Sequence, residues 1–286
     1  MSEKIVRFLT KSPLHIVILL ICVVWMLPSF GLFISSFRPA VDVTGSGWWS
    51  VFQTPFDFTQ FTVRNYVEVI ADQGMGRAFV NSLVITIPST IIPIVVAAFA
   101  AYAFAWMRFR GRNVLFIVVV ALLVVPLQMT LIPILRIYNR LGLSGSFFAV
   151  WLAHTGYGLP FAIYLFRNYF GGLPRDLLES AYMDGASRWK VFLKIILPLS
   201  VPAIASVGIF QFLWVWNDLL VALIYLGGTE DVAPMTLQVS NLVGYLGQDW
   251  HVLTAAAFVS MILPLVVFFA LQRYFVRGIL SGSVKG

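Results

Sequence analysis

Charged side chains are scarce in this chain of 286 residues: they make up 11% of it, whereas 60% of the residues are hydrophobic and the mean hydropathy is +0.90. A water-soluble domain carries about 25% charged residues, so this sequence cannot build a surface that faces water on all sides. With one cysteine, Cys22, the chain has neither a disulfide framework nor a thiolate metal cluster.

Signatures of enzymatic chemistry are also missing from the sequence. The three histidines are scattered and no H-E-x-x-H occurs, so we expect no catalytic residue and no metal site. The phosphate-binding pattern G-x-x-x-x-G-K-[ST] does not occur either, which excludes this chain as a P-loop ATPase. The chain should therefore be neither an enzyme nor the holder of a cofactor.

Long apolar runs take the place of the missing charges. Six of them reach the roughly 20 residues that a bilayer core requires: 14–37, 78–107, 114–135, 147–166, 199–226 and 252–271. Because the runs are continuous rather than alternating, they indicate helices. The sequence thus predicts an all-α membrane protein with six transmembrane helices.

The basic residues predict the orientation of these helices. Of the 19 Lys and Arg residues, all but Arg38, Arg64, Arg77, Arg136 and Arg140 lie in the two terminal segments or in the even-numbered connections between runs. Cytoplasmic loops keep an excess of Lys and Arg, so both termini are expected in the cytoplasm. The net charge of +7 follows from this asymmetry and requires no nucleic acid.

Two long loops are expected on the outer side. Residues 38–77 are rich in aromatic side chains and end in an amphipathic helical pattern at 61–72, and residues 227–251 contain three acidic residues without Lys or Arg. Loops longer than about 12–15 residues are usually functional or disordered, which favours a docking role over an inert connection.

A polar segment, residues 174–198, separates the fourth and fifth runs and reads PRDLLESAYMDGASRWKVFLKIILP. We expect two short helices: the first begins at Pro174 and ends at Gly185, which suits a left-handed closing residue, and the second starts near Ser187. On the first helix, one face carries Leu177, Leu178, Ala181 and Tyr182. The residues alone leave two functions open, an amphipathic helix on lipid headgroups or a docking element for another protein.

The order of residues in this segment resembles a family motif. Glu179-Ser180-Ala181, Gly185, Ile195 and Leu197-Pro198 follow the spacing E-A-A-x3-G-x9-I-x-L-P found in permeases of ATP-binding-cassette (ABC) importers, with Ser180 as the one departure. Trp216-Asn217-Asp218-Leu219 resembles the W-N-D/E-F/L signature of sugar permeases, and residues 276–286 are similar to the tail of MalG-like permeases. The chain thus resembles binding-protein-dependent, MalG-like carbohydrate-uptake permeases of the maltose/α-glucoside type.

That resemblance implies the type I importer permease (MetI-like) fold in a bacterial inner membrane. It divides the chain into residues 1–77, with the first span and outer loop, a permease core at 78–272 that includes the coupling loop 174–198, and a cytoplasmic tail at 273–286. The chain would form half of a translocation pore and couple closure of a partner ATPase to alternating access. The alternative, an ion-coupled secondary sugar transporter, would normally show ionisable residues in mid-membrane and inverted repeats.

The resemblance also implies partners and site residues. The partners are a homodimeric ABC ATPase that binds ATP and Mg, a second, MalF-like permease, an extracytoplasmic sugar-binding protein and membrane lipid, with no nucleic acid. Coupling to the ATPase would involve Glu179, Ser180, Ala181, Gly185, Ile195, Leu197 and Pro198, and the tail contact would involve Gly282, Lys285 and Gly286. The translocation pathway would include Trp214, Asn217, Asp218 and Tyr157, and the contact loop for the binding protein Asn241, Tyr245, Gln248 and Asp249.

Two questions about the spans stay open at this level. Asp218 could line the sugar path or fix the packing of two spans, because a charge in mid-membrane has to face protein or water. His154, which lies in the fourth apolar run, is expected to be a packing residue rather than a ligand. The identity of the sugar is not encoded in any residue that the sequence singles out.

Overall fold

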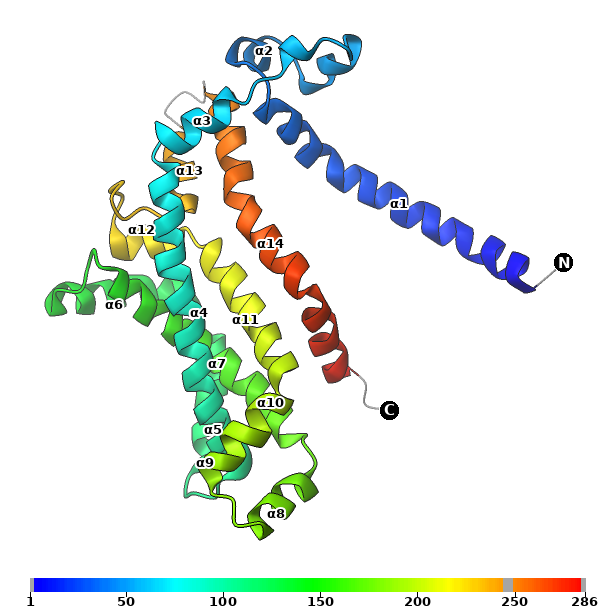
Figure 1. Ribbon diagram of the computed structural model, residues 1–286. Coiled ribbons are helices and arrows are strands. Elements are labelled where there is room, and N and C mark those ends of the chain that lie inside the picture. The colour runs from blue at the N-terminus through cyan, green and yellow to red at the C-terminus, as the bar shows by residue number, and fades with distance from the viewer. Residues whose placement is uncertain (1–2, 244–248, 284–286) are drawn as a thin grey trace. The chain divides into compact units, whose positions relative to one another are not determined.

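A computed structural model describes the backbone of residues 3–243 and 249–283 and the side chains of residues 12–243 and 249–272. Every regular element in these residues is a helix, which confirms the all-α part of the predicted fold class (Figure 1). The chain divides into two compact units, which are described separately. The first unit comprises Met1–Gly76 and Val239–Ser260, and the second comprises Arg77–Gln238 and Met261–Gly286.

The first unit holds the long helix α1 (Glu3–Ser36), the short helices α2 (Ala40–Gly45) and α3 (Arg64–Ala71), and the beginning of α14 (Trp250–Ser283). Helix α3 confirms the predicted amphipathic helix. The loop before it is organised around Arg38, which is 4% exposed and donates hydrogen bonds to Ser46 Oγ at 2.7 Å and Ser50 Oγ at 3.1 Å. Asn65 donates to the carbonyl of Arg38 at 2.8 Å and so joins this loop to α3.

The second unit contains most of the remaining helices (Figure 1). The helices up to the polar segment are α4 (Met75–Trp106), α5 (Arg112–Ala121), α6 (Leu127–Leu141) and α7 (Phe147–Gly171). The polar segment forms α8 (Arg175–Met183), α9 (Arg188–Val191) and α10 (Leu197–Leu199). Helices α11 (Val201–Trp216), α12 (Leu220–Leu226) and α13 (Met235–Leu242) follow.

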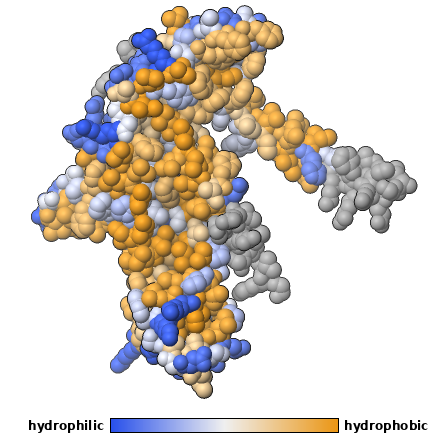
Figure 2. All heavy atoms as spheres, viewed as in Figure 1, coloured by the Kyte–Doolittle hydropathy of each residue, from blue (hydrophilic) through white to orange (hydrophobic). Residues whose placement is uncertain are grey.

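Large parts of the helix surfaces are apolar. Figure 2 shows hydrophobic residues along the visible sides of the long helices and hydrophilic residues near their ends. Within the described residues, three helices are long and apolar enough to cross a membrane: Ser12–Ser36, Met75–Trp106 and Trp250–Gln272. Two bent helix pairs raise the number to five if each pair is one span. The chain is therefore a multi-pass membrane protein, although the predicted run 147–166, which lies in α7, does not add a sixth span by this measure.

Two predicted spans are not continuous helices in the structure. The run 114–135 is broken at Pro126, where Arg112–Val124 and Leu127–Leu141 meet at 102°. Proline disfavours helical geometry in the residue before it, and Val125 is accordingly extended with ψ 116°. The run 199–226 is divided between Trp216 and Leu220, where α11 ends and α12 begins. Helix α14 also continues to Ser283, through most of the expected tail 273–286.

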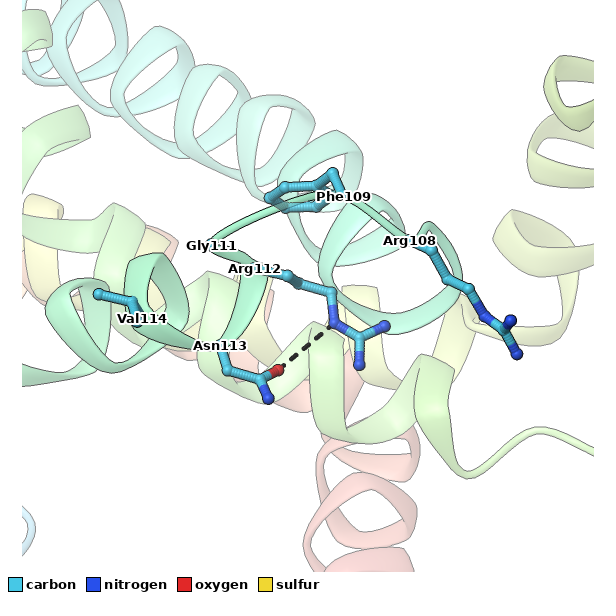
Figure 3. Close-up of a pocket in the computed structure, with 6 residues that line it drawn as sticks. All are labelled: Arg108, Phe109, Gly111, Arg112, Asn113 and Val114. Carbon is cyan, nitrogen blue, oxygen red and sulfur yellow. Dashed lines mark hydrogen bonds between the residues drawn. The ribbon is translucent and has the colours of Figure 1, made fainter.

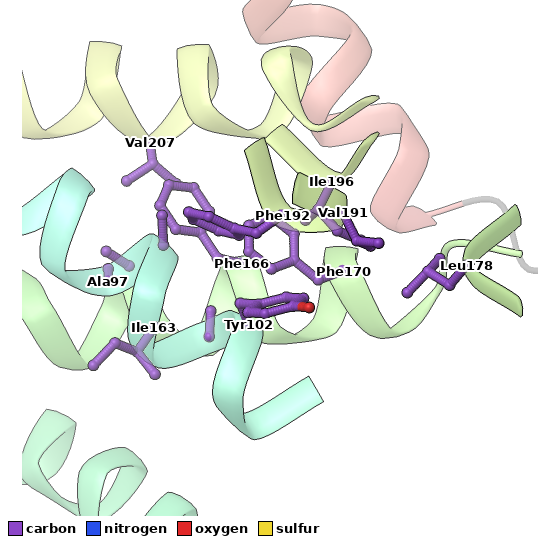
Figure 4. Packing of buried hydrophobic residues seen from close by; sticks show 13 residues of the cluster. Ala97, Tyr102, Ile163, Phe166, Phe170, Leu178, Val191, Phe192, Ile196 and Val207 are labelled. Carbon is purple, nitrogen blue, oxygen red and sulfur yellow. The ribbon is translucent and has the colours of Figure 1, made fainter. Parts of the chain in front are cut away.

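The main core of the second unit lies between α4, α7 and α11, at the end where the polar segment begins. Small residues of α4, such as Ala97 and Ala101, let the bulky side chains of α7 and of the polar segment approach closely. Phe166 and Phe170 of α7 stack with ring centroids 5.8 Å apart, and Val207 of α11 packs on the same cluster (Figure 4). This core fixes the polar segment to the three helices.

Candidate functional site

The first helix of the polar segment, α8, is held mainly by one side chain. Leu178 is 2% exposed and belongs to the core between α4, α7 and α11, and Ala181 is half-buried against it. The other two residues of the predicted apolar face, Leu177 and Tyr182, are 46% and 41% exposed. An isolated helix shorter than ~12–15 residues is marginal in water, so the nine residues of α8 depend on this packing.

Helix α8 ends in a Schellman motif at Gly185. The backbone of Gly185 is left-handed, with φ +76°, and its N–H donates to the Tyr182 carbonyl at 3.0 Å. The Ala186 N–H donates to the Ala181 carbonyl at 2.9 Å, which completes the pair of bonds that defines the motif. This geometry confirms the predicted conformation of Gly185, while Pro174 precedes the helix instead of being its first residue.

The second half of the segment is buried more deeply. Ser187 caps α9 by accepting a hydrogen bond from the Lys190 N–H at 3.3 Å, as expected for a helix start. Residues Phe192–Ile196 then form a wider, π-helical turn. The turn lies just before Pro198, whose ring would clash with the Lys194 carbonyl in a regular α-helix.

Figure 4 shows how this half enters the core: Val191, Phe192 and Ile196 point toward the aromatic side chains of α7. Of the predicted coupling residues here, Ile195 and Leu197 are half-buried against the same cluster, whereas Pro198 is exposed. The residues after Gly185 are therefore anchored in the core.

Tyr102 of α4 links both halves of the segment to a long helix. Its hydroxyl lies 3.3 Å from the Tyr182 hydroxyl on α8 and donates to the Arg188 carbonyl at the start of α9, at 3.1 Å. Its ring packs on Phe192 with centroids 5.0 Å apart. Helices α8 and α9 are consequently joined to α4 as well as to α7.

The opposite side of α8 faces away from the core. Glu179 and Ser180 are exposed, and Met183 is 88% exposed. Glu179 also lies at the edge of a hollow of about 750 Å³ that is lined by several arginines. A short helix with one buried side and one exposed side, joined to α4 and α7, can transmit a displacement from a partner to those two helices.

The predicted pathway residues lie around the break between α11 and α12. Asp218 accepts hydrogen bonds from the Val221 and Ala222 N–H groups, at 3.4 and 3.1 Å, and thereby caps α12. One of its carboxylate oxygens is 3.7 Å from Nε2 of His154. The Asn217 side chain donates to the Leu213 carbonyl of its own helix at 2.7 Å.

Tyr157 and Trp214 line a common cavity of about 390 Å³. The Tyr157 hydroxyl lies 2.8 Å from the Thr130 hydroxyl and 3.0 Å from that of Tyr225. His154 is completely buried, with its ring edge-on to Trp214 at 5.4 Å. The structure thus brings together three of the four predicted pathway residues, since Asp218 adjoins His154.

Sequence reasoning missed the hydroxyl partners of Tyr157. Thr130 lies on α6 and Tyr225 on α12, far from Tyr157 in the sequence, so no local spacing connects them. The sequence could have indicated them only by residue type, because hydroxyl groups in apolar spans require hydrogen-bond partners. Within the described residues, no group of three or more His, Cys, Asp or Glu side chains could hold a metal ion.

The two remaining predicted contact regions are only partly described. Asn241 is exposed at the end of α13, and Asp249 is exposed just before α14. Tyr245 and Gln248 lie outside the described residues, as do Lys285 and Gly286. Gly282 belongs to the last turn of α14.

Residues 93–281 match the family described as "Binding-protein-dependent transport system inner membrane component". The chain is 66% identical over 284 residues to the osmoprotective compounds uptake permease protein GgtD of Synechocystis sp., covering 99% of this chain and 95% of the relative. It is 57% identical over 247 residues to the alpha-glucoside transport system permease protein AglG of Rhizobium meliloti, covering 85% of this chain and 65% of the relative.

Among solved structures, the chain is similar to one from a bacterial ABC transporter that imports the acidic polysaccharide alginate. The TM-score is 0.74 at 21% identity, covering 96% of this chain and 99% of the other. At this identity the likeness establishes the importer-permease fold.

Proposed function

This chain belongs to the family of binding-protein-dependent transport system inner membrane components, and from this premise we propose that it forms half of the pore of an ATP-driven carbohydrate importer and couples ATPase closure to alternating access. The single observation that carries the coupling role is that one side of α8 is buried, at Leu178, while another side is exposed, at Glu179. Permease subunits of this family are transport components, not enzymes.

The proposed substrate is an α-glucoside or another small glycoside of the maltose/oligosaccharide type. The relative named for alpha-glucoside transport supports this class. No side chain described above selects one sugar, so the extracytoplasmic binding protein would supply the selectivity.

The proposed coupling surface comprises the exposed residues of α8 and its closing turn. Glu179 would pair with a basic group of the ATPase, and the small side chains of Ser180, Ala181 and Gly185 would allow close contact. Beyond that turn, Ile195, Leu197 and Pro198 would carry the displacement into α11. Because Phe192 and Ile196 are completely buried in the core, this part would move as one body with α4 and α7.

In the proposed orientation the polar segment, which belongs to the core at 78–272, lies with both termini on the cytoplasmic side. Two copies of an ATPase would bind ATP and Mg there, and the end of the chain, with Gly282, Lys285 and Gly286, would reach between them. A second, MalF-like permease would complete the pore. The binding protein would dock outside on a loop that includes Asn241, Tyr245, Gln248 and Asp249.

The proposed pathway runs past Tyr157, Trp214, Asn217 and Asp218. Aromatic side chains suit the apolar faces of sugar rings, and the hydroxyl of Tyr157 already has two hydroxyl neighbours with which a sugar could exchange hydrogen bonds. The carboxylate of Asp218 is engaged with the backbone of α12, which supports a role in shaping the path over direct contact with sugar.

Uptake by the complete transporter in proteoliposomes tests this function. With ATP inside and the binding protein outside, a panel of α-glucosides headed by maltose should be accumulated, and accumulation should stop without ATP. Glu179→Lys should abolish uptake while the subunit still inserts, whereas Glu68→Lys on α3, the same charge reversal in the other unit, should retain it. Accumulation driven by an ion gradient in the absence of ATP would refute the proposal.

A further inference from the structure

Four arginines surround the hollow beside α8, and we call this site the arginine hollow. Its volume is about 750 Å³, and its basic residues are Arg108, Arg112, Arg167 and Arg175. They come from the turn between α4 and α5, the end of α7 and the start of α8. In its lining, the acidic counterpart is Glu179 alone. The hollow therefore carries a strong excess of positive charge.

This charge is not neutralised within the described part of the chain. None of the four arginines lies within ion-pair distance of a carboxylate there, including that of Glu179. Like charges held in one hollow repel one another, and a partly buried site screens that repulsion less than bulk water does. An anion with several acceptor oxygens would relieve the repulsion and satisfy the guanidinium donors.

Local contacts hold two of the guanidinium groups in place. Arg112 donates a hydrogen bond to the Met107 carbonyl at 3.2 Å. It also donates one to the side-chain oxygen of Asn113 at 3.4 Å (Figure 3). The guanidinium carbon of Arg167 lies 4.9 Å over the ring of Phe116. Positioned guanidinium groups bind phosphate with less loss of side-chain freedom than free ones.

The hollow adjoins an exposed apolar helix face. A second hollow of about 470 Å³ shares Arg108 and Arg112 and extends to Val114, at the start of α5 (Figure 3). From there α5 presents an apolar face: Val114 and Ile117 are each 65% exposed. On the other side Trp106, an indole of the type enriched at membrane interfaces, donates to the Phe170 carbonyl at 3.1 Å.

We propose that the arginine hollow binds the phosphate of an anionic phospholipid headgroup, with the acyl chains along the exposed face of α5. The shared chemistry is a phosphate anion, and the continuity between the basic hollow and the apolar helix face identifies lipid, rather than soluble phosphate, as its source. Basic pockets between transmembrane helices bind anionic headgroups in this way. The headgroup lies against α8, so lipid composition affects the position of that helix.

The test uses the complete transporter in bilayers that contain a trace of spin-labelled phosphatidylglycerol or phosphatidylcholine. The measured quantity is the preference for phosphatidylglycerol over phosphatidylcholine among the labelled lipids whose motion is restricted by contact with the protein. Each arginine that contacts the headgroup should contribute about fivefold to this preference, so Arg108→Gln combined with Arg112→Gln should lower it about 25-fold. Arg167→Gln alone should lower it about fivefold by the same reasoning.

Arg110→Gln is the matched control, because Arg110 lies in the same turn and is exposed but lines neither hollow. It should leave the preference unchanged. An equal loss in this control would mean that the lipid preference depends on the total charge of the turn, and the assigned site would be wrong. An unchanged preference in the double variant would overturn the proposal outright.

Two further experiments distinguish a lipid from the other possible ligands of the arginine hollow. Inorganic phosphate is added so that its negative charge equals that of the anionic lipid. If it displaces the labelled lipid, the ligand is a soluble anion and the lipid assignment fails. If the double variant keeps its lipid preference but loses co-purifying ATPase subunits, the hollow is a protein contact and the proposal again fails. Neither result touches ATP-driven uptake by the unmodified transporter, which tests the proposed function separately.

Discussion

Leu178 offers the sharpest perturbation of the proposed coupling helix. It is 2% exposed, and it is the one fully buried residue of α8. Replacing a buried leucine by alanine costs about 2–5 kcal/mol, and the open surroundings of a surface helix place this site near 3 kcal/mol. Because 1.4 kcal/mol is a factor of about ten, Leu178→Ala should raise the fraction of detached α8 about a hundredfold.

Hydrogen exchange of the purified complete transporter measures that fraction directly. Amides of residues 175–186 should exchange about a hundredfold faster in Leu178→Ala, whereas those of α7 should be little changed, since exchange reports local opening free energies. ATP hydrolysis should continue while ATP-driven uptake falls, because a detached helix no longer moves the core.

The neighbouring leucine gives the control. Leu177 is 46% exposed, so Leu177→Ala should change the exchange of α8 by less than a factor of about three, in line with the small effects of surface substitutions. Equal exchange in Leu178→Ala and the unmodified protein would refute the idea that this side chain holds α8. Normal uptake with fast exchange would refute the mechanical role of that attachment.

Substitutions at Gly185, Gly158 and Asp218 test neighbouring parts of the account. Gly185→Val forces a left-handed backbone at φ +76° on a branched residue, which should cost about 1–2 kcal/mol and lower ATP-driven uptake while membrane insertion, followed by immunoblot, stays normal. Gly158→Ala would place a methyl group 2.6 Å from Oε1 of Gln211, so thermal unfolding of the complex should occur at lower temperature, whereas Gly156→Ala meets open space and should not lower it. Asp218→Ala should lower the stability by about 1 kcal/mol in the same thermal assay because the cap of α12 is lost, and Asp218→Asn should keep that cap. If both variants have normal stability but fail to transport, the charge of Asp218 acts in the pathway instead.

The sequence predicted the local features of the polar segment well. Gly185 has the predicted left-handed conformation because glycine pays no steric penalty there, and the second helix begins near Ser187 as predicted. Both assignments depend on interactions within a few residues. Apolar runs likewise predicted the helical fold, since burial in lipid requires internally bonded backbone.

Features that depend on long-range packing were missed. The break at Pro126 was visible as a proline, but proline is tolerated in membrane helices, so the 102° bend could not be distinguished from a mild kink. The hydroxyl group of Tyr157 meets partners on α6 and α12 only after the chain has folded. Of the predicted face on α8, Leu178 alone became fully buried, because the helix touches the core along a narrow strip.

The most direct test of the central claim is a crosslink from the exposed side of α8. Cys22 is exposed and would first be replaced by serine, after which Ser180→Cys provides the single thiol of this chain within the complete transporter. The account predicts crosslinks from this thiol to the ATPase subunits, with a yield that changes when ATP binds. Crosslinks to the binding protein instead, or labelling by a membrane-impermeant thiol reagent added outside intact cells, would contradict it.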